Sequence, residues 1–93
     1  MNQLNKLLHQ ELRLAIMSYL SAVDWADFNK LLEITQATKG NLSVQIKKLQ
    51  EANYIDVKKS FKNNYPLTQC KITKKGQEAL DQYVKDLKEL LNI

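Results

Sequence analysis

The chain has 93 residues, of which 44% are hydrophobic and 26% are charged, so we expect one small globular domain over residues 1–93. Its apolar runs are too short to cross a bilayer, and its N-terminus lacks the layout of a signal peptide. The single cysteine, Cys70, excludes an internal disulfide, which favours a cytoplasmic protein without a membrane partner.

The net charge of +4 is unevenly distributed along the chain. Residues 39–75 carry nine lysines against two acidic residues, a net +7, whereas residues 1–38 and 76–93 carry −1 and −2. A one-sided basic field suits a polyanion, and nucleic acid is the commonest one. Charge alone leaves open the alternative of a solvated lysine-rich surface.

The first segment, about residues 4–23, has apolar residues at helical spacing and a broad apolar stripe. It forms either one bent helix or two short ones. A second helix is predicted over about residues 27–35, with Asp24 or Asp27 placed to cap it. Trp25, in the break between the two, is interpreted as a core or hairpin-packing residue.

A third helix is predicted over about residues 39–53. Thr38 is placed to cap its start. Asn53 lies near its end, and asparagine tolerates the left-handed conformation that often closes a helix.

Two alternating segments follow at about residues 54–61 and 67–73, with a polar turn over residues 62–66, and they predict a β-hairpin. A last helix is predicted over about residues 76–91. The order helix-helix-helix-strand-strand-helix describes a winged helix-turn-helix, a mainly α fold with a β-hairpin wing at about residues 58–71.

The third helix is the candidate recognition helix. With Leu42, Ile46 and Leu49 turned inward, its outer side carries small, amide and charged residues: Gly40, Asn41, Ser43, Val44, Lys47, Lys48 and Glu51. In the major groove, an amide can bond to an adenine edge, an aliphatic group can touch a thymine methyl, and a lysine can reach guanine or phosphate. In the alternative reading, the amides only start the helix and the lysines only face water.

The predicted hairpin tip offers a cation, two amides and an aromatic ring, which are Lys62, Asn63, Asn64 and Tyr65. Lys58 and Lys59 lie on the strand that supports it. These groups suit flanking phosphates or a minor groove, although an exposed turn would also explain the asparagines.

Four short stretches resemble the winged-helix DNA-binding family related to MarR- and ArsR-type transcriptional regulators. They are DF..LLE.T from Asp27, T.GNLS..IKKL from Thr38, EANYI from Glu51 and KIT.KG from Lys71. The resemblance implies a transcriptional regulator that binds double-stranded DNA as a homodimer. It also implies that the recognition helix carries Asn41, Ser43, Val44, Gln45 and Lys48, and that the wing runs through residues 62–66.

The sequence departs from this family at two points. The wing tip lacks an arginine, and Asn53 stands where related chains often have a glycine. Insertion of an arginine into the minor groove is therefore not available, and we expect wing contacts limited to phosphates.

Metal and catalytic chemistry are not indicated. The soft-ligand candidates His9 and Cys70 lie far apart in sequence, so we predict no metal site and no cofactor. The chain shows no Gly-rich phosphate loop, nucleophile elbow or paired carboxylates, so we predict that it is not an enzyme.

The terminal segments 1–23 and 76–91 carry more apolar residues than a small core needs. We predict that they pair across a two-fold axis through Leu4, Leu7, Leu8, Tyr83, Val84, Leu87, Leu90 and Leu91. Two recognition helices would then meet major grooves about 34 Å apart on a pseudo-palindromic site.

The predicted function is that of a sequence-specific regulator of transcription. Its alternative is a winged helix that binds an acidic protein partner. The sequence does not define an effector, an operator or the sign of regulation. The candidate DNA-binding residues are Thr38, Lys39, Gly40, Asn41, Ser43, Val44, Gln45, Lys47, Lys48, Lys58, Lys59, Lys62, Asn63, Asn64 and Tyr65.

Overall fold

The computed structural model describes residues 3–93. Its elements in chain order are α1 (Glu11–Leu20), β1 (Ala26–Asp27), α2 (Phe28–Thr35), α3 (Lys39–Glu51), β2 (Ile55–Lys62), β3 (Tyr65–Ile72) and α4 (Lys74–Leu91). This is the predicted order with the short strand β1 added, and it confirms the winged-helix fold class. Met1 and Asn2, which belong to the predicted domain and to the predicted terminal segment, lie outside the described residues.

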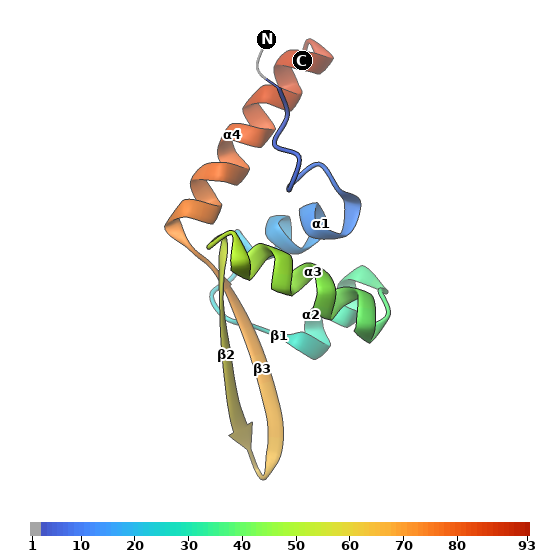
Figure 1. The fold of residues 1–93 in the computed structure, drawn as a ribbon, viewed down its shortest axis with the longest axis vertical. Coiled ribbons are helices and arrows are strands. Elements are labelled where there is room, and N and C mark those ends of the chain that lie inside the picture. The colour runs from blue at the N-terminus through green and yellow to red at the C-terminus, as the bar shows by residue number, and fades with distance from the viewer. Residues whose placement is uncertain (1–2) are drawn as a thin grey trace.

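The molecule is elongated, with extents of 50 × 25 × 21 Å. Figure 1 shows why: α1, α2 and α3 gather in the middle, the β2–β3 hairpin projects to one end, and α4 extends to the other. The outer side of α3 and the end of α4 therefore lie in different parts of the molecule.

The segment of about residues 4–23, predicted as one bent helix or two short ones, contains a single helix, α1, which begins only at Glu11. The side chain of Asn5 accepts hydrogen bonds from two backbone N–H groups in the turn that follows it. Gln10 then caps α1, since its side chain accepts a hydrogen bond from the backbone N–H of Arg13. These bonds offer the backbone an alternative to a continuous helix.

The caps of α3 follow the sequence closely, whereas the capping bond predicted for α2 does not form. Thr38 caps α3 as predicted, with its Oγ1 accepting a hydrogen bond from the backbone N–H of Asn41 at 3.1 Å. Asn53 has a φ of 62°, the left-handed conformation expected for it. Asp27 occupies the N-cap position of α2 but makes no side-chain capping bond, and its carboxylate accepts a hydrogen bond from Gln69 Nε2.

The wing belongs to a three-stranded antiparallel sheet in the order β1-β3-β2. Its turn consists of Asn63 and Asn64, with φ of 52° and 67°, so it is shorter than the predicted turn over residues 62–66. Two consecutive left-handed residues are typical of a type I′ turn, whose twist matches that of the flanking strands. Asparagine is one of the few residues that tolerate this geometry.

Pro66 lies inside β3, opposite Phe61, rather than in the turn. The two-residue turn makes Lys62 and Tyr65 the hydrogen-bonded pair that closes the hairpin. The next pair, Phe61 and Pro66, is then of the non-hydrogen-bonded type, which does not use the N–H that proline lacks.

Every helix and strand contributes residues to one apolar core, and this core holds the fold together. Its buried residues are Leu8, Ile16, Met17, Leu20, Ala26, Leu31, Leu42, Ile46, Leu49, Ile55, Cys70, Leu80 and Tyr83. Within residues 3–93, no helix is both long and apolar enough to span a membrane.

The start of α4 packs against the backbone that leads into β2. Thr73 donates its backbone N–H to the carbonyl oxygen of Tyr54 at 3.0 Å, and its Oγ1 accepts a hydrogen bond from the backbone N–H of Gly76 at 2.9 Å. A Cβ on Gly76 would lie 2.1 Å from the Tyr54 carbonyl oxygen. Only glycine allows this approach without a backbone shift.

Tyr54 joins three parts of the chain that are distant in sequence. Besides its backbone contacts with the start of α4, its hydroxyl accepts a hydrogen bond from Asn5 Nδ2 at 2.9 Å. Lys75 Nζ lies 5.8 Å from the centre of its ring. The base of the wing, the start of α4 and the segment before α1 are therefore fixed together at the end of α3.

Gly76→Ala is expected to lower the free energy of unfolding by about 2 kcal/mol or more, the cost of forcing an extra carbon into a packed site. Gly40→Ala is the matched control, because nothing lies within 4 Å of a Cβ at that exposed helical position. It should raise stability by about 0.5–1 kcal/mol. Urea unfolding measures both, and equal stability of the two variants would contradict the proposed contact.

Candidate nucleic-acid interface

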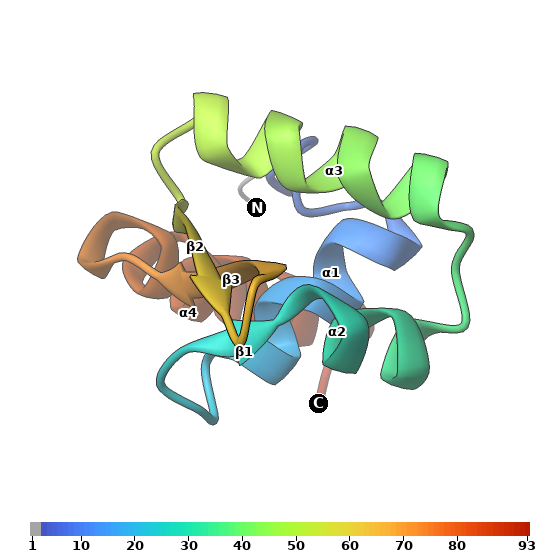
Figure 2. The same ribbon diagram turned by 90° about the horizontal axis from the view of Figure 1, so that it is seen from below.

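Helix α3 is held by one face only. Leu42 and Leu49 are fully buried and Ile46 is 6% exposed, as the predicted inward set requires. Figure 2 shows α3 along the margin of the molecule, with α1 and α2 on its inner side and no element on its outer side. The outer side is thus open along the whole helix.

Eight of the nine candidate residues at the cap and on α3 are exposed, namely Thr38, Lys39, Gly40, Asn41, Ser43, Val44, Lys47 and Lys48. The space beside Gly40 is empty, and Val44 is 50% exposed. The ion pairs among residues 3–93 are Lys30–Glu33 and Lys71–Asp24, and neither involves a lysine of α3. The outer side of α3 therefore carries small side chains with open space near its start and lysines further along the helix.

Gln45 does not belong to this surface, and its placement on the DNA-contacting face is wrong. It is 8% exposed, because at 100° per residue it falls on the inner side of the helix with Leu42 and Leu49. Its Oε1 accepts a hydrogen bond from Arg13 Nη1, and its Nε2 donates to Asn41 Oδ1 at 2.9 Å. A polar residue can occupy this inward position because both ends of its amide are paired.

The candidate residues of the wing are exposed, but they do not share one face. Lys59 lines the side that faces α3. Lys58, its neighbour, points to the opposite side, where its Nζ lies 4.4 Å from the centre of the Trp25 ring. Lys71 joins it there, 5.9 Å from the same ring and 3.0 Å from Asp24 Oδ1.

Two aromatic residues take part that the sequence patterns did not assign to this surface. Phe61 is 78% exposed near the hairpin tip, beside the candidate Tyr65 at 75%. Trp25, interpreted as a packing residue, holds lysines of the wing by cation–π contacts. The length of β2 could have indicated the exposure of Phe61, because Phe61 shares a strand face with Ile55 but lies six residues further along the hairpin, beyond the reach of the core.

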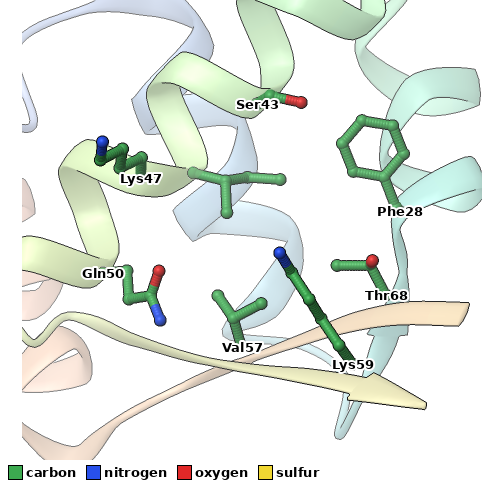
Figure 3. A pocket seen from close by; sticks show the side chains of 8 residues that line it. Phe28, Ser43, Lys47, Gln50, Val57, Lys59 and Thr68 are labelled. Atoms are coloured by element: carbon green, nitrogen blue, oxygen red, sulfur yellow. The ribbon is translucent and has the colours of Figure 1, made fainter.

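A groove of about 550 Å³ separates α3 from the wing. Figure 3 shows Ser43, Lys47 and Gln50 on the helix side and Val57, Lys59 and Thr68 on the hairpin side, with Phe28 at one end. Lys47 and Lys59 place a cation on each wall. The open face of α3 therefore continues into a basic groove rather than ending at a packed hairpin.

The residues predicted for the dimer interface divide into two groups. Leu8 and Tyr83 are 0% and 2% exposed, so their description as spare apolar surface is wrong. They are covered because the irregular segment before α1 folds back onto α4, where His9 Nδ1 lies 2.8 Å from Tyr83 Oη. Leu4, Leu7 and Leu87 are partly buried against the core, and the exposed members are Val84, Leu90 and Leu91.

Cys70 and His9 do not converge. Cys70 is fully buried in the core on β3, and His9 pairs with Tyr83 on α4. Burial raises the pKa of the Cys70 thiol to about 11. Across residues 3–93 no three histidine, cysteine or acidic side chains lie close enough to hold a metal ion.

Comparison with known proteins agrees with this geometry. Residues 12–91 match the family described as the winged helix DNA-binding domain, and the chain belongs to that family. The chain is 33% identical, over 91% of its length and 92% of the relative's, to an uncharacterized protein of Methanocaldococcus jannaschii. Membership of a DNA-binding family agrees with the prediction that the chain is not an enzyme.

Two solved structures share the fold. A transcriptional regulator homologue from Pyrococcus horikoshii OT3 superposes with a TM-score of 0.86 at 27% identity, over 92% of this chain and 85% of that one. The protein ytfH from Salmonella typhimurium superposes with a TM-score of 0.76 at 16% identity, over 91% and 77% of the two chains, and supports the fold alone. The chain thus has the winged-helix fold of the DNA-binding family to which it belongs.

The buried thiol gives a test of the core beneath the wing. At pH 8 the native Cys70 should react with a thiol reagent at least about a hundredfold more slowly than the denatured chain, because a pKa of about 11 leaves little thiolate. The unfolded thiol ionises near pH 8.5, so this group favours the unfolded state as the pH rises above that value. Equal rates for native and denatured protein would contradict the burial.

Proposed function

We propose that this protein is a homodimeric transcriptional regulator that binds a pseudo-palindromic site in double-stranded DNA. The observation that supports it most is the open outer face of α3, cationic and unpaired, in a chain of the winged-helix DNA-binding family. The major groove of B-DNA, about 12 Å wide, admits one helix, and α3 is free to enter it on the whole of its outer side.

The positions along α3 suggest different roles. Gly40 and Ser43, near its start, allow close approach to the base edges. Val44 offers methyl groups to a thymine. Lys47 and Lys48, one to two turns further, reach phosphates or guanine. The helix N-terminus adds backbone N–H groups of its own to the phosphate contacts.

The wing supplies backbone contacts beside the groove. Lys59 suits the phosphates nearest to α3 and Lys62 those at the tip, while Lys58 is held on the far side of the hairpin by Trp25. Asn63 and Asn64 shape the turn through their backbone conformation and leave their amides exposed. Since the tip has no arginine, phosphate binding is the role that its chemistry supports.

A second copy of the chain completes the proposed binding unit. Val84, Leu90 and Leu91 are 40%, 44% and 55% exposed on one stripe of α4, next to the partly buried Leu87. Figure 1 shows this end of α4 extending past the helical bundle, away from the wing. Pairing there would leave both recognition helices free. A DNA-binding role agrees with the cytoplasmic location that we expect from the sequence.

The lysines of α3 provide the first test. Replacing Lys47 and Lys48 together by Ala should weaken binding to duplex DNA and reduce the slope of log K against log salt by about 0.9 for each phosphate that is no longer neutralised. The double variant Lys85→Ala with Lys88→Ala, on α4, removes the same charge elsewhere and serves as the control. Fluorescence anisotropy with a site selected from a random duplex pool measures both.

Unchanged affinity in the Lys47 and Lys48 variant would refute the assigned face. Equal losses in the two double variants would show that only total charge matters. Binding of an acidic protein without any affinity for duplex DNA would favour the alternative of a protein-interaction module.

The α4 stripe provides the second test. Wild-type protein should sediment as a dimer at micromolar concentration, and Leu90→Ser with Leu91→Ser should shift it to monomer, because the variant lacks the exposed apolar area that drives pairing. The variant should also bind a full palindrome no more tightly than a half-site. A wild-type monomer under these conditions would contradict the dimer.

A further inference from the structure

A chain of hydrogen bonds crosses from α1 to the start of α3. Arg13 on α1 donates Nε–H to the carbonyl oxygen of Leu7 at 2.6 Å and Nη1–H to Gln45 Oε1. Gln45 then donates Nε2–H to Asn41 Oδ1 at 2.9 Å. This chain of hydrogen bonds ends at Asn41, an exposed residue in the first turns of the candidate recognition helix.

The donor at one end of this chain determines the direction of every bond in it. A guanidinium has donors only, so Arg13 must face the oxygen of the Gln45 amide. The NH₂ group of Gln45 then faces Asn41 and requires an acceptor there, which is the carbonyl oxygen of Asn41. The NH₂ group of Asn41 is left over, and within residues 3–93 no acceptor takes it up.

We propose that Arg13 and Gln45 are positioning residues that fix the Asn41 side chain with its NH₂ group outward, as a hydrogen-bond donor for DNA. The proposal rests on the DNA-binding function proposed above. The reversed orientation would set the NH₂ groups of Asn41 and Gln45 against each other. Because Gln45 is only 8% exposed, water cannot readily compensate for the missing hydrogen bond.

This orientation selects the chemistry of the contact. An outward NH₂ group pairs with an acceptor, either a phosphate oxygen or a base acceptor such as guanine N7 and O6 or thymine O4. The NH₂ group cannot pair with the N4 amine of cytosine, because both groups are hydrogen-bond donors. A bidentate contact with adenine needs both the oxygen and the nitrogen of one amide, so the oxygen of Asn41 would have to accept a second hydrogen bond beside the one from Gln45.

Gln45→Glu tests the proposal by reversing the direction of the hydrogen bond between residue 45 and Asn41. The introduced carboxylate still accepts from Arg13, but it presents a second acceptor to Asn41, which must then turn its NH₂ group inward and its oxygen outward. Gln36→Glu is the matched control, since it adds the same charge to an exposed position in the turn before α3, outside the groove and without touching these hydrogen bonds. Asn41→Ala identifies what the outward group contacts.

Selection from random duplex pools gives one readout. If Asn41 contacts a base, Asn41→Ala should flatten the preference at one base pair, and Gln45→Glu should change that preference from an acceptor to a donor such as cytosine N4. If it contacts a phosphate, the preferences should stay and Gln45→Glu should lose roughly fivefold more affinity than Gln36→Glu, the equivalent of one hydrogen bond. Identical behaviour of the two variants would overturn the proposal.

Side-chain amide exchange in NMR gives a readout that needs no DNA. In the wild-type protein the Gln45 NH₂ should be protected from exchange and the Asn41 NH₂ should exchange freely, whereas Gln45→Glu should protect Asn41. A protected Asn41 amide in the wild type would overturn the proposal. Failure of the DNA-binding function would appear instead as a wild-type chain without affinity for duplex DNA, whatever the amides show.

Discussion

The burial of α3 on one side only is the constraint on which the rest of the molecule depends. Leu42, Ile46 and Leu49 fix the helix to the core, and full burial of one leucine or isoleucine side chain is worth about 1.5–3 kcal/mol. In so short a chain no second layer is available to cover the other side. An open helical face is thus a consequence of the small core, and the residues on that face are free to serve binding rather than packing.

The elements that could be predicted from the sequence are those whose apolar spacing or capping chemistry is local. The inner face of α3, the Thr38 cap, the left-handed Asn53 and the hairpin are of this kind. β1 was missed because two residues carry no periodicity, and it forms only by pairing with β3. The shortening of the first helix depends on the side chains of Asn5 and Gln10, which apolar spacing does not report.

The candidate site was predicted less completely, because side-chain partners decide it. Gln45 is polar and is among the candidate DNA-binding residues, yet Arg13, thirty-two positions away, pairs with it inside. Leu8 and Tyr83 were assigned to spare apolar surface, yet both are buried once the chain before α1 folds back onto α4. In each case the local pattern suggested contact with solvent or with a partner molecule. The side chain instead contacts residues of the same chain that are distant in sequence.

A net charge of only +4 becomes a directional field because the fold separates the two signs. The lysines of residues 39–75 lie on α3, on the wing and at the start of α4, whereas the carboxylates of residues 76–93 lie along α4. The wing and the far end of α4 point in opposite directions (Figure 1). A polyanion is therefore attracted to the edge formed by α3 and the wing and weakly repelled from the apolar stripe of α4, so the proposed pairing of two copies would not compete with DNA for one surface.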